Sequence, residues 1–256
     1  MHFIGIIPAR FASTRFPGKP LAMIHGKSMI RRVYEQAVSC KTLNTVVVAT
    51  DDQRIYDHVS GFGRVVMTRA DHASGTARCL EAFQKINTEN MYGPEDGIVN
   101  IQGDEPFIDP GQIDQVVACL KDPRKHIVTL AKRITHELEI HDPNVVKVVF
   151  SQSGNAMYFS RGCIPFVLAD GNEKGYAGLG IHYKHIGIYG YRAVILKRIV
   201  SLKESSLEAA EKLEQLRWMQ QDFKIFVEET YKEGFAIDTP EDLKKVLKHS
   251  GGPVGT

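Results

Sequence analysis

Short apolar runs and helical patterns alternate along the first hundred residues. Four apolar runs, each closed by proline, glycine or polar residues, predict buried strands at 3–7, 45–50, 64–68 and 98–101. Apolar residues recur at helical spacing between these runs, over 28–39, through Ile55 and Val59, and through Leu80, Phe83 and Ile86. Strands that alternate with helices indicate βαβ units, so the pattern predicts an α/β fold with a mainly parallel central sheet.

From about residue 127 this alternation stops. Strand-like runs follow with little helix between them, at 127–131, 145–150, 156–160 and 185–191. They predict antiparallel strands, and we expect a single domain over 1–256 in which about 127–191 forms a substrate-binding or dimerisation subregion. Glycine and charged residues are concentrated over 170–180, which predicts a mobile loop there.

The last third of the sequence returns to helical patterns. Ser205 and Glu208 have the spacing of a capping box, which predicts the start of a helix that continues through 213–219. Beyond it, the pattern predicts a strand over 224–229, the end of another strand at 236–238, a final helix opened by Thr239 and Pro240, and a frayed tail over 250–256.

Composition excludes several classes of protein. The 256 residues suffice for one large domain or two small ones, with 43% hydrophobic and 24% charged residues, as in ordinary globular proteins. A net charge of +2 gives no overall field that would attract nucleic acid or an anionic membrane, so any anion site must be local. We find no signal peptide and no run of about 20 apolar residues that would span a membrane.

The cysteines indicate a reducing compartment. Cys40, Cys79, Cys119 and Cys163 are far apart and form no CxxC pair. That spacing argues against a cysteine zinc site and against a disulfide framework. Separate thiols favour a cytoplasmic protein.

A polar loop follows the first strand and carries Arg10, Ser13, Arg15 and Lys19. Ligands of open α/β sheets bind beyond the carboxyl ends of strands, so these cations and hydroxyls suit a polyphosphate. A basic surface loop after an edge strand is the alternative. A P-loop is excluded because Leu21 stands where its first glycine should be, and no GxGxxG is present, which disfavours an ATPase or a dinucleotide-dependent dehydrogenase.

Two aspartates also follow predicted strands. Asp104 precedes a turn that contains a proline, and Asp238 stands in the same way near the C-terminus. Each alone is most simply a turn or capping residue. Together with a basic loop able to hold a triphosphate they suggest a magnesium site, because Mg²⁺ is usually bound by one or two carboxylates plus substrate phosphates.

Seven motifs occur in order and cover most of the chain: IIPAR-x-x-STR-x-PGKP (6–20), TRADH-x-SGT (68–76), NIQGDEP (100–106), VKVV…YFSR (146–161), KHIGIYGYR (184–192), LEQLR (213–217) and DTPEDL (238–243). In this combination the chain resembles the 3-deoxy-manno-octulosonate cytidylyltransferases. The resemblance implies a Rossmann-like nucleotidyltransferase fold, with helices on both faces of the sheet and a smaller antiparallel lobe. It also implies that CTP and 3-deoxy-manno-octulosonate (Kdo) give CMP-Kdo and pyrophosphate, with Mg²⁺, for lipopolysaccharide synthesis, and it favours a homodimer.

The resemblance also implies roles for residues at the matching positions. Lys19, Asp104 and Asp238 would be catalytic, with the two aspartates holding Mg²⁺. Arg10, Ser13, Arg15 and Lys19 would bind the phosphates of CTP, and the 69–78 segment with Ser74 and Arg78 would form the cytosine and ribose pocket. The residues implied for Kdo are Gln102, Arg161, His185, Tyr189, Glu214 and Gln215. Two departures are visible, since Ala77 replaces an acidic residue common in the family and 164–170 lacks a common arginine.

Simpler readings stand beside these roles. Arg161 after a strand is by default a surface cation, and His185 and Tyr189, on one face of a strand, could form a substrate wall or a packed core. Glu214 and Gln215 could be solvated helix surface. We assign His72 no catalytic role and expect it simply to brace the 69–78 loop.

The expected mechanism is metal-assisted attack of the sugar hydroxyl on the α-phosphorus, with no covalent enzyme intermediate. The alternatives are a cytidylyltransferase for another acid sugar such as sialic acid, a non-catalytic nucleotide-binding module of the same fold, and, third, a redox function.

Overall fold

The computed structural model describes residues 1–168 and 175–248. One sheet contains β1 (Phe3–Ala9), β4 (Thr45–Thr50), β5 (Val65–Met67), β6 (Gly97–Asn100), β7 (Ile127–Arg133), β8 (Lys147–Phe150), β9 (Ala156–Ser160), β10 (Tyr183–Arg192) and β11 (Phe226–Glu229). A small hairpin is formed by β2 (Met23–Ile24) and β3 (Lys27–Ser28).

The helices that connect and cover these strands are α1 (Met29–Ser39), α2 (Gln53–Ser60), α3 (Gly75–Ile86), α4 (Pro110–Leu120), α5 (Glu137–His141), α6 (Ala193–Val200), α7 (Ser206–Glu211), α8 (Gln215–Met219) and α9 (Pro240–Lys248). Two short 3-10 turns, η1 (Lys19–Leu21) and η2 (Ala177–Leu179), complete the described elements.

The central sheet has the strand order β11-β7-β10-β6-β1-β4-β5. Only β10 runs against its neighbours, because it pairs antiparallel with both β6 and β7 while the other pairs along this order are parallel. The mainly parallel sheet is therefore confirmed. Of the predicted antiparallel strands, β7 and β10 extend this sheet, and β8 and β9 form a ribbon attached to β10.

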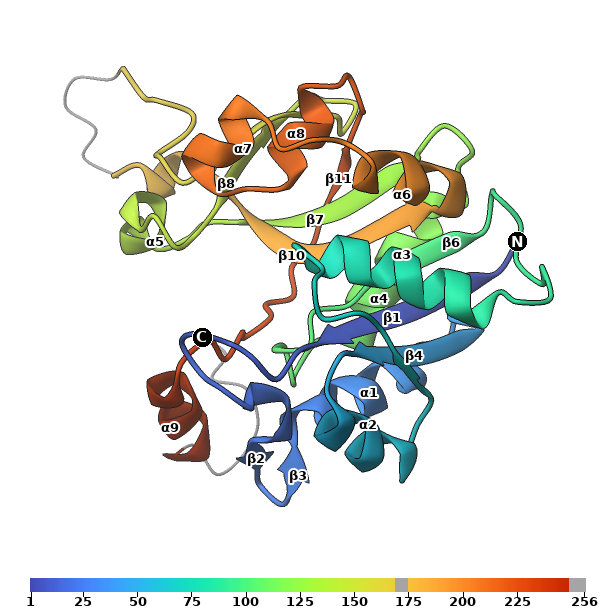
Figure 1. The fold of residues 1–256 in the computed structure, drawn as a ribbon. Helices are drawn as coiled ribbons and strands as arrows, with labels where there is room; N and C mark the ends of the chain where they lie inside the picture. Colours follow the sequence, from blue (N-terminus) through green and yellow to red (C-terminus); the bar gives the residue numbers. More distant parts are fainter. Residues whose placement is uncertain (169–174, 249–256) are drawn as a thin grey trace.

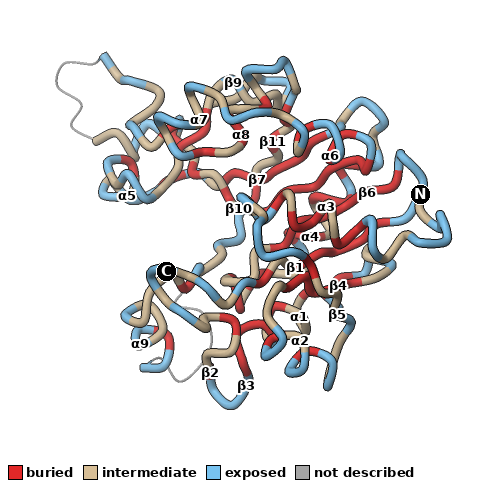
Figure 2. Tube along the Cα trace, in the orientation of Figure 1, coloured by how far each residue is buried: buried red, intermediate tan, exposed pale blue. Residues whose placement is uncertain are grey.

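Both faces of the sheet are covered by helices, and the buried positions lie along its strands (Figures 1 and 2). Side chains alternate between the faces: Phe3 and Ile7 of β1 pack in the core with α1, α2 and α4, whereas Ile4 and Ile6 pack in the core with α3, α6 and α8. A strand buried on both faces reads as a continuous apolar run, which explains the opening pattern of the sequence.

Three details differ from the predictions. Helices α4, α5 and α6 were not predicted. The helix expected from Ser205 through 213–219 is two helices, because Lys212 adopts a left-handed conformation with φ 53° and ends α7, although the predicted capping box is present. The strand expected to end at 236–238 is wrong, since 231–239 forms no strand; instead the Ile237 N–H donates to the Asp104 carbonyl oxygen over 2.9 Å.

Two expectations fall wholly or partly outside the described residues. The 250–256 tail does so entirely, and of the 170–180 loop only 175–180 is described. None of the helices in the described ranges has the length and hydrophobicity needed to cross a membrane. All four cysteines are described, unpaired thiols.

Candidate active site

A cavity of about 260 Å³ opens at the carboxyl ends of β1 and β6, next to the N-terminus of α3. Four stretches distant in sequence line it: the loop after β1, the start of α3, the loop after β6, and Asp238 before α9. The polar residues in its wall are Arg10, Ser13, Arg15, Lys19, His72, Ser74, Arg78, Gln102, Asp104 and Asp238. All the residues predicted for the nucleotide and the metal thus line one cavity.

Lys19 stands between the two aspartates. Its ammonium nitrogen lies 2.8 Å from an Asp104 carboxylate oxygen and 3.2 Å from an Asp238 carboxylate oxygen. The Lys19 side chain is only 13% exposed, but Asp238 is 40% exposed, so water screens the pair with Asp238 more than the pair with Asp104. The Lys19 ammonium therefore brings together two carboxylates from segments that are distant in sequence.

The loop after β1 has a fold of its own that delivers Lys19. Gly18 has φ 71°, a conformation that favours glycine, and a Cβ there would lie 3.0 Å from the Phe11 ring. The Gly18 N–H donates to the Phe11 carbonyl oxygen over 2.9 Å, and the Arg54 guanidinium lies 3.3 Å from the centre of the Phe11 ring. These contacts bring Gly18 back against Phe11, and η1 then begins at Lys19.

The other cations of this loop reach the same cavity. Arg15 lies 3.3 Å from the second Asp238 carboxylate oxygen, but its side chain is 65% exposed, so this pair contributes little to stability. Arg10 and Ser13 line the cavity close to the end of β1. Several positive charges and two carboxylates therefore line one cavity, with the Lys19 ammonium between the carboxylates.

Helix α3 begins at the opposite wall, with Ser74 as its N-cap. The Ser74 hydroxyl oxygen accepts a hydrogen bond from the Ala77 N–H over 3.2 Å and its hydroxyl donates to Glu214 over 2.9 Å. Thr76 donates to the other oxygen of Glu214 over 2.7 Å. The N-terminus of a helix of this length attracts anions, and Glu214 ties it to the segment before α8.

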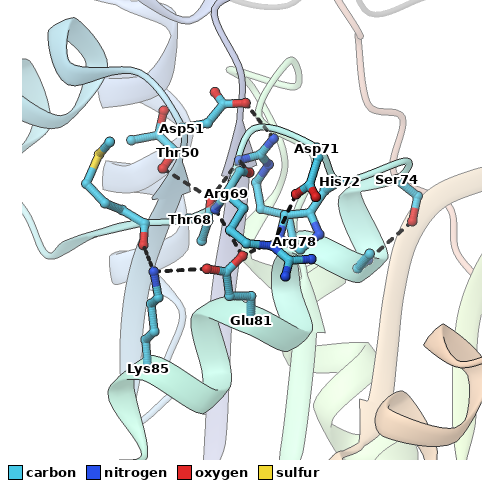
Figure 3. A network of polar contacts seen from close by, with 12 residues as sticks. Thr50, Asp51, Thr68, Arg69, Asp71, His72, Ser74, Arg78, Glu81 and Lys85 are labelled. Carbon is cyan, nitrogen blue, oxygen red and sulfur yellow. Dashed lines mark hydrogen bonds and ion pairs between the residues drawn. The ribbon is translucent and has the colours of Figure 1, made fainter.

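Arg78 is a buried structural clamp as well as part of the cavity wall. Its guanidinium donates to the Thr68 hydroxyl over 2.6 Å, to the Arg69 carbonyl oxygen over 3.2 Å and to the Asp51 carboxylate over 2.8 Å (Figure 3). These bonds join the ends of β4 and β5 to α3.

His72 braces the loop before α3, as predicted. Its ring bonds the Glu81 carboxylate, which also accepts from the Arg69 N–H over 3.0 Å (Figure 3). Lys85 adds a contact of 2.9 Å to the same carboxylate. Burial alone would raise the pKa of Glu81, but the hydrogen bonds from Lys85, the Arg69 N–H and His72 outweigh it and hold the pKa at about 2.

Most residues predicted for Kdo lie beyond the wall of this cavity. Of the six, only Gln102 lines it, and its amide donates to the Gly187 carbonyl oxygen over 2.9 Å. His185 and Tyr189 share a face of β10, with ring centroids 5.2 Å apart. The pairing of β10 with β7 is irregular between Ile186 and Tyr189, yet the shift is even and keeps both side chains on that face.

Part of the surroundings of these residues is packed core. Tyr189 is 7% exposed and meets Trp218 edge to face, with centroids 5.3 Å apart. Gln215 is buried, so the interpretation of Gln215 as solvated helix surface is wrong, and the carboxylate of Glu214 is bonded to Ser74 and Thr76. Glu214 is thus the described link between the cavity and the residues predicted for the sugar acid.

His185 is held as a neutral ring. Its Nε2 lies 2.9 Å from the Thr129 hydroxyl oxygen, and that hydroxyl donates to the Ile188 carbonyl oxygen over 2.7 Å. Because the hydroxyl has a single proton, the His185 Nε2–H is the donor in their shared bond. Burial lowers the pKa of His185 to about 3, so the ring is uncharged at neutral pH.

Sequence reasoning missed Glu105, which follows Asp104 in the QGDEP motif. It is 8% exposed, and its Oε2 has no hydrogen-bond partner among the described residues. Burial, with the charge of Asp104 second, raises the pKa of Glu105 to about 7. Nothing in the local sequence distinguishes it from an exposed turn carboxylate. Its burial arises because the 230–239 segment crosses over it, with Gly234 in close approach.

Known proteins share this sequence and fold over nearly their full length. The family model for cytidylyltransferases matches residues 4–230. A 3-deoxy-manno-octulosonate cytidylyltransferase of Parabacteroides distasonis is 52% identical over 254 residues, which cover 96% of this chain and 97% of that protein. The protein of that name in Bacteroides thetaiotaomicron is 51% identical over 248 residues, covering 95% of this chain and 96% of that protein.

The chain belongs to the 3-deoxy-manno-octulosonate cytidylyltransferase family. The resemblance noted in the sequence is therefore confirmed, as is the enzyme class, a nucleotidyltransferase. A solved structure of CMP:2-keto-3-deoxy-manno-octonic acid synthetase complexed with CTP superposes with a TM-score of 0.87. It shares 39% sequence identity and covers 97% of this chain and 98% of its own. The Rossmann-like nucleotidyltransferase fold expected from the sequence is thus confirmed.

Proposed function

We propose that this protein transfers the cytidylyl group of CTP to the anomeric hydroxyl of Kdo, with release of pyrophosphate. The observation that carries the proposal is the cavity itself, in which a basic loop, a helix N-terminus and two carboxylates meet at the carboxyl edge of the sheet. A relative with this fold is complexed with CTP. The product, CMP-Kdo, would supply Kdo for lipopolysaccharide synthesis.

The basic loop would bind the triphosphate. Arg10, Arg15 and Lys19 line the cavity together with Ser13, and their charges would offset those that develop on the departing pyrophosphate. Ser74 and Arg78 at the opposite wall would contact the ribose and the cytosine. Phosphoryl-type transfer needs little covalent chemistry from a protein, so positioning and charge neutralisation account for the rate.

The aspartates fit a magnesium ion. Among the described residues no group of three or more His, Cys, Asp or Glu side chains is placed to hold a metal by itself. Two carboxylates that face one point suit Mg²⁺, which takes its remaining ligands from phosphates and water. Asp104 and Asp238 would hold the ion; when bound, it would neutralise phosphate charge and lower the pKa of the sugar hydroxyl. Lys19 would then turn from the aspartates toward the phosphates.

Kdo would bind on the far side of Glu214. Arg161 would face its carboxylate, and Gln102, His185, Tyr189, Glu214 and Gln215 would contact its hydroxyls. A neutral His185 and the phenol of Tyr189 suit hydroxyl groups better than a second carboxylate. The hydroxyl would attack the α-phosphorus directly and lose its proton to water: the new oxygen–phosphorus bond forms as the bond to the pyrophosphate oxygen breaks, with no enzyme-bound intermediate.

Pyrophosphate release from CTP and Mg²⁺, measured with and without Kdo, tests the proposal. We expect release only with Kdo, and weaker release with other nucleoside triphosphates. Release driven by sialic acid but not by Kdo would establish the alternative acid-sugar specificity. Nucleotide binding without pyrophosphate release from any pair of substrates would establish a non-catalytic module.

The same proposal includes a cytoplasmic homodimer. Large apolar side chains are exposed on α5 and in the described parts of the loop that follows β9 (163–168 and 175–181): Leu138 is 87% exposed, Phe166 78% and Leu168 94%. These two parts of the chain meet, because Glu137 accepts hydrogen bonds from the N–H groups of Tyr176 and Ala177. A second copy of the chain would cover this apolar surface.

A further inference from the structure

Lys147 of β8 is a buried cation with unusual partners. It is 0% exposed, and its ammonium donates to three backbone carbonyl oxygens, those of Asp142 over 2.8 Å, Val145 over 2.6 Å and Arg161 over 2.7 Å. Within residues 1–168 and 175–248, the hydrogen bonds of this ammonium all go to backbone carbonyl oxygens and none goes to a carboxylate. The carbonyls satisfy its donors without cancelling its charge, and burial lowers the pKa of Lys147.

Glu211, the last residue of α7, contacts the same stretch of backbone as Lys147, at Ser160 and Arg161. One carboxylate oxygen accepts from the Arg161 N–H over 2.8 Å and the other from the Ser160 hydroxyl over 2.7 Å. Both peptide groups of Arg161 are thus fixed, its N–H by Glu211 and its carbonyl oxygen by Lys147. The end of β9 is held in one conformation by two charged side chains.

The Arg161 side chain is hydrogen-bonded to Glu211 and to the 142–145 turn that Lys147 contacts. Its Nε donates to the Glu211 carbonyl oxygen over 2.8 Å and its Nη1 to the Pro143 carbonyl oxygen over 2.9 Å. Pro143 lies in the 142–145 turn that Lys147 holds. Within the described part of the chain, Arg161 Nη2 makes no hydrogen bond and the guanidinium forms no ion pair. Its remaining N–H groups can therefore donate two parallel hydrogen bonds to a carboxylate.

We infer that Lys147 and Glu211 are positioning residues for the guanidinium of Arg161, and that they set the affinity of the enzyme for the carboxylate of its sugar acid. This inference rests on the proposed function, in which Arg161 faces that carboxylate. A guanidinium held in advance loses little conformational freedom when the anion binds.

Steady-state kinetics of three single variants test the inference. Lys147→Met keeps the length of the side chain and removes the charge, Glu211→Gln is the milder change, and Arg161→Ala removes the guanidinium. We expect the KM for Kdo to rise about tenfold or more in each, with the KM for CTP changed less than about twofold. An analogue of Kdo with an amide in place of its carboxylate should bind the wild type and the variants equally.

The double variant Lys147→Met/Arg161→Ala separates positioning from a general defect. If Lys147 acts through Arg161, adding Lys147→Met to Arg161→Ala leaves the KM for Kdo where Arg161→Ala alone puts it. Fully additive effects would overturn the inference.

Arg192 provides a matched control. It too is a buried cation that donates to backbone carbonyl oxygens, those of Leu120 over 2.8 Å and Asp122 over 3.0 Å, and it differs from Lys147 in a further ion pair of 3.1 Å with the exposed Glu95. It is the last residue of β10 and pairs with Gly97, the first residue of β6, so it lies at the opposite end of these strands from the cavity. We expect Arg192→Met to lower the melting temperature without changing the KM for Kdo.

The outcomes separate two failures. If Arg161→Ala leaves the KM for Kdo unchanged, the role of Arg161 in the proposed function is wrong. If Arg161→Ala raises it while folded Glu211→Gln and Lys147→Met do not, the proposed function stands and the positioning role is overturned. Should Lys147→Met fail to fold, Glu211→Gln alone decides between these results.

Discussion

Lys19 and its two aspartates hold each other in place at the centre of the site. An ammonium at 2.8 Å and 3.2 Å from two carboxylates prevents their mutual repulsion in the absence of substrates. In the proposed function, a divalent cation that binds the same oxygens would displace this ammonium. The Lys19 side chain would then turn to the triphosphate, so it would have one role in the free enzyme and another in the substrate complex.

Lys19→Met should separate these two roles. We expect Mg²⁺ to bind the nucleotide-free variant roughly tenfold more tightly than the wild type, because the competing ammonium is gone. Turnover should fall by about 100-fold, since a cation at the departing pyrophosphate is lost. Titration calorimetry and pyrophosphate release measure these effects. Lys27→Met, at an exposed lysine paired with Glu35, is the control, and weaker Mg²⁺ binding by Lys19→Met would contradict the competition.

Asp238→Asn tests the metal site itself. The amide keeps the shape of the side chain and removes the charge that would hold Mg²⁺, so turnover should fall by at least about 100-fold while CTP still binds. Stopped assays and equilibrium CTP binding report the two quantities. Glu241→Gln, an exposed carboxylate in the first turn of α9, should be active; near-normal turnover of Asp238→Asn would rule out its role.

Among the elements, α3 has the most direct part in the site, and its N-terminus lacks one half of a capping box. Ser74 caps the Ala77 N–H, but Ala77 offers no side chain to return a hydrogen bond to Ser74. Helix α7 contains the complete version, formed by Ser205 and Glu208. The two helices therefore allow a comparison within one protein.

Ala77→Glu should complete the box on α3. We expect the free energy of unfolding to rise by about 0.5–1 kcal/mol, through the reciprocal hydrogen bond and the negative charge at the positive end of the helix. Urea denaturation measures the change. Ala77→Lys serves as the control, because it places a positive charge at the same helix end and should destabilise; equal stability of the two variants would exclude the capping explanation.

At the scale of the whole molecule, the buried neutral His185 couples stability to pH. Its pKa is about 3 in the folded chain, against an ordinary value of 6.5 when unfolded. Above pH 6.5 both states are neutral and the residue has no effect. As pH falls from 6.5 toward 3, only the unfolded state takes up the proton, so stability is lost, by at most about 1.4 kcal/mol per pH unit.

His185→Gln should reduce the loss of stability at acid pH. The glutamine amide can still donate to Thr129 but does not titrate, so its free energy of unfolding should fall less between pH 6.5 and 4 than that of the wild type. Urea denaturation at several pH values gives the slopes. His126→Gln, at an exposed histidine, should keep the wild-type slope. An unchanged slope for His185→Gln would mean that the ring is protonated in the folded state.

The proposed homodimer is also a property of the whole molecule. Phe166→Ser/Leu168→Ser removes two of its most exposed apolar side chains, so we expect light scattering to give a lower mass than for the wild type at equal concentration. Tyr231→Ser, at an aromatic residue that is 87% exposed elsewhere, should leave the mass unchanged. A wild-type mass equal to that of one chain would refute the dimer.

The sequence by itself determined the alternation of strands and helices, the mainly parallel sheet, the capping box at Ser205 and the polar residues that follow β1 and β6. These features depend on local sterics and on the period with which apolar side chains repeat, so neighbouring residues encode them. The same local rules misjudged 236–238 and the break at Lys212, because an extended segment has no pairing pattern of its own and a left-handed residue interrupts a helix without a glycine signal.

Only the tertiary structure decided which groups meet. Lys19 joins Asp104, 85 positions away, and Asp238, 219 positions away, and Glu214 reaches the N-terminus of α3 across 140 positions. Such contacts depend on how helices pack on the sheet and on where the 230–239 segment crosses it. The burial of Glu105 and the fastening of Arg161 by Lys147 and Glu211 have the same origin, because desolvation and charge pairing arise from the whole packed chain.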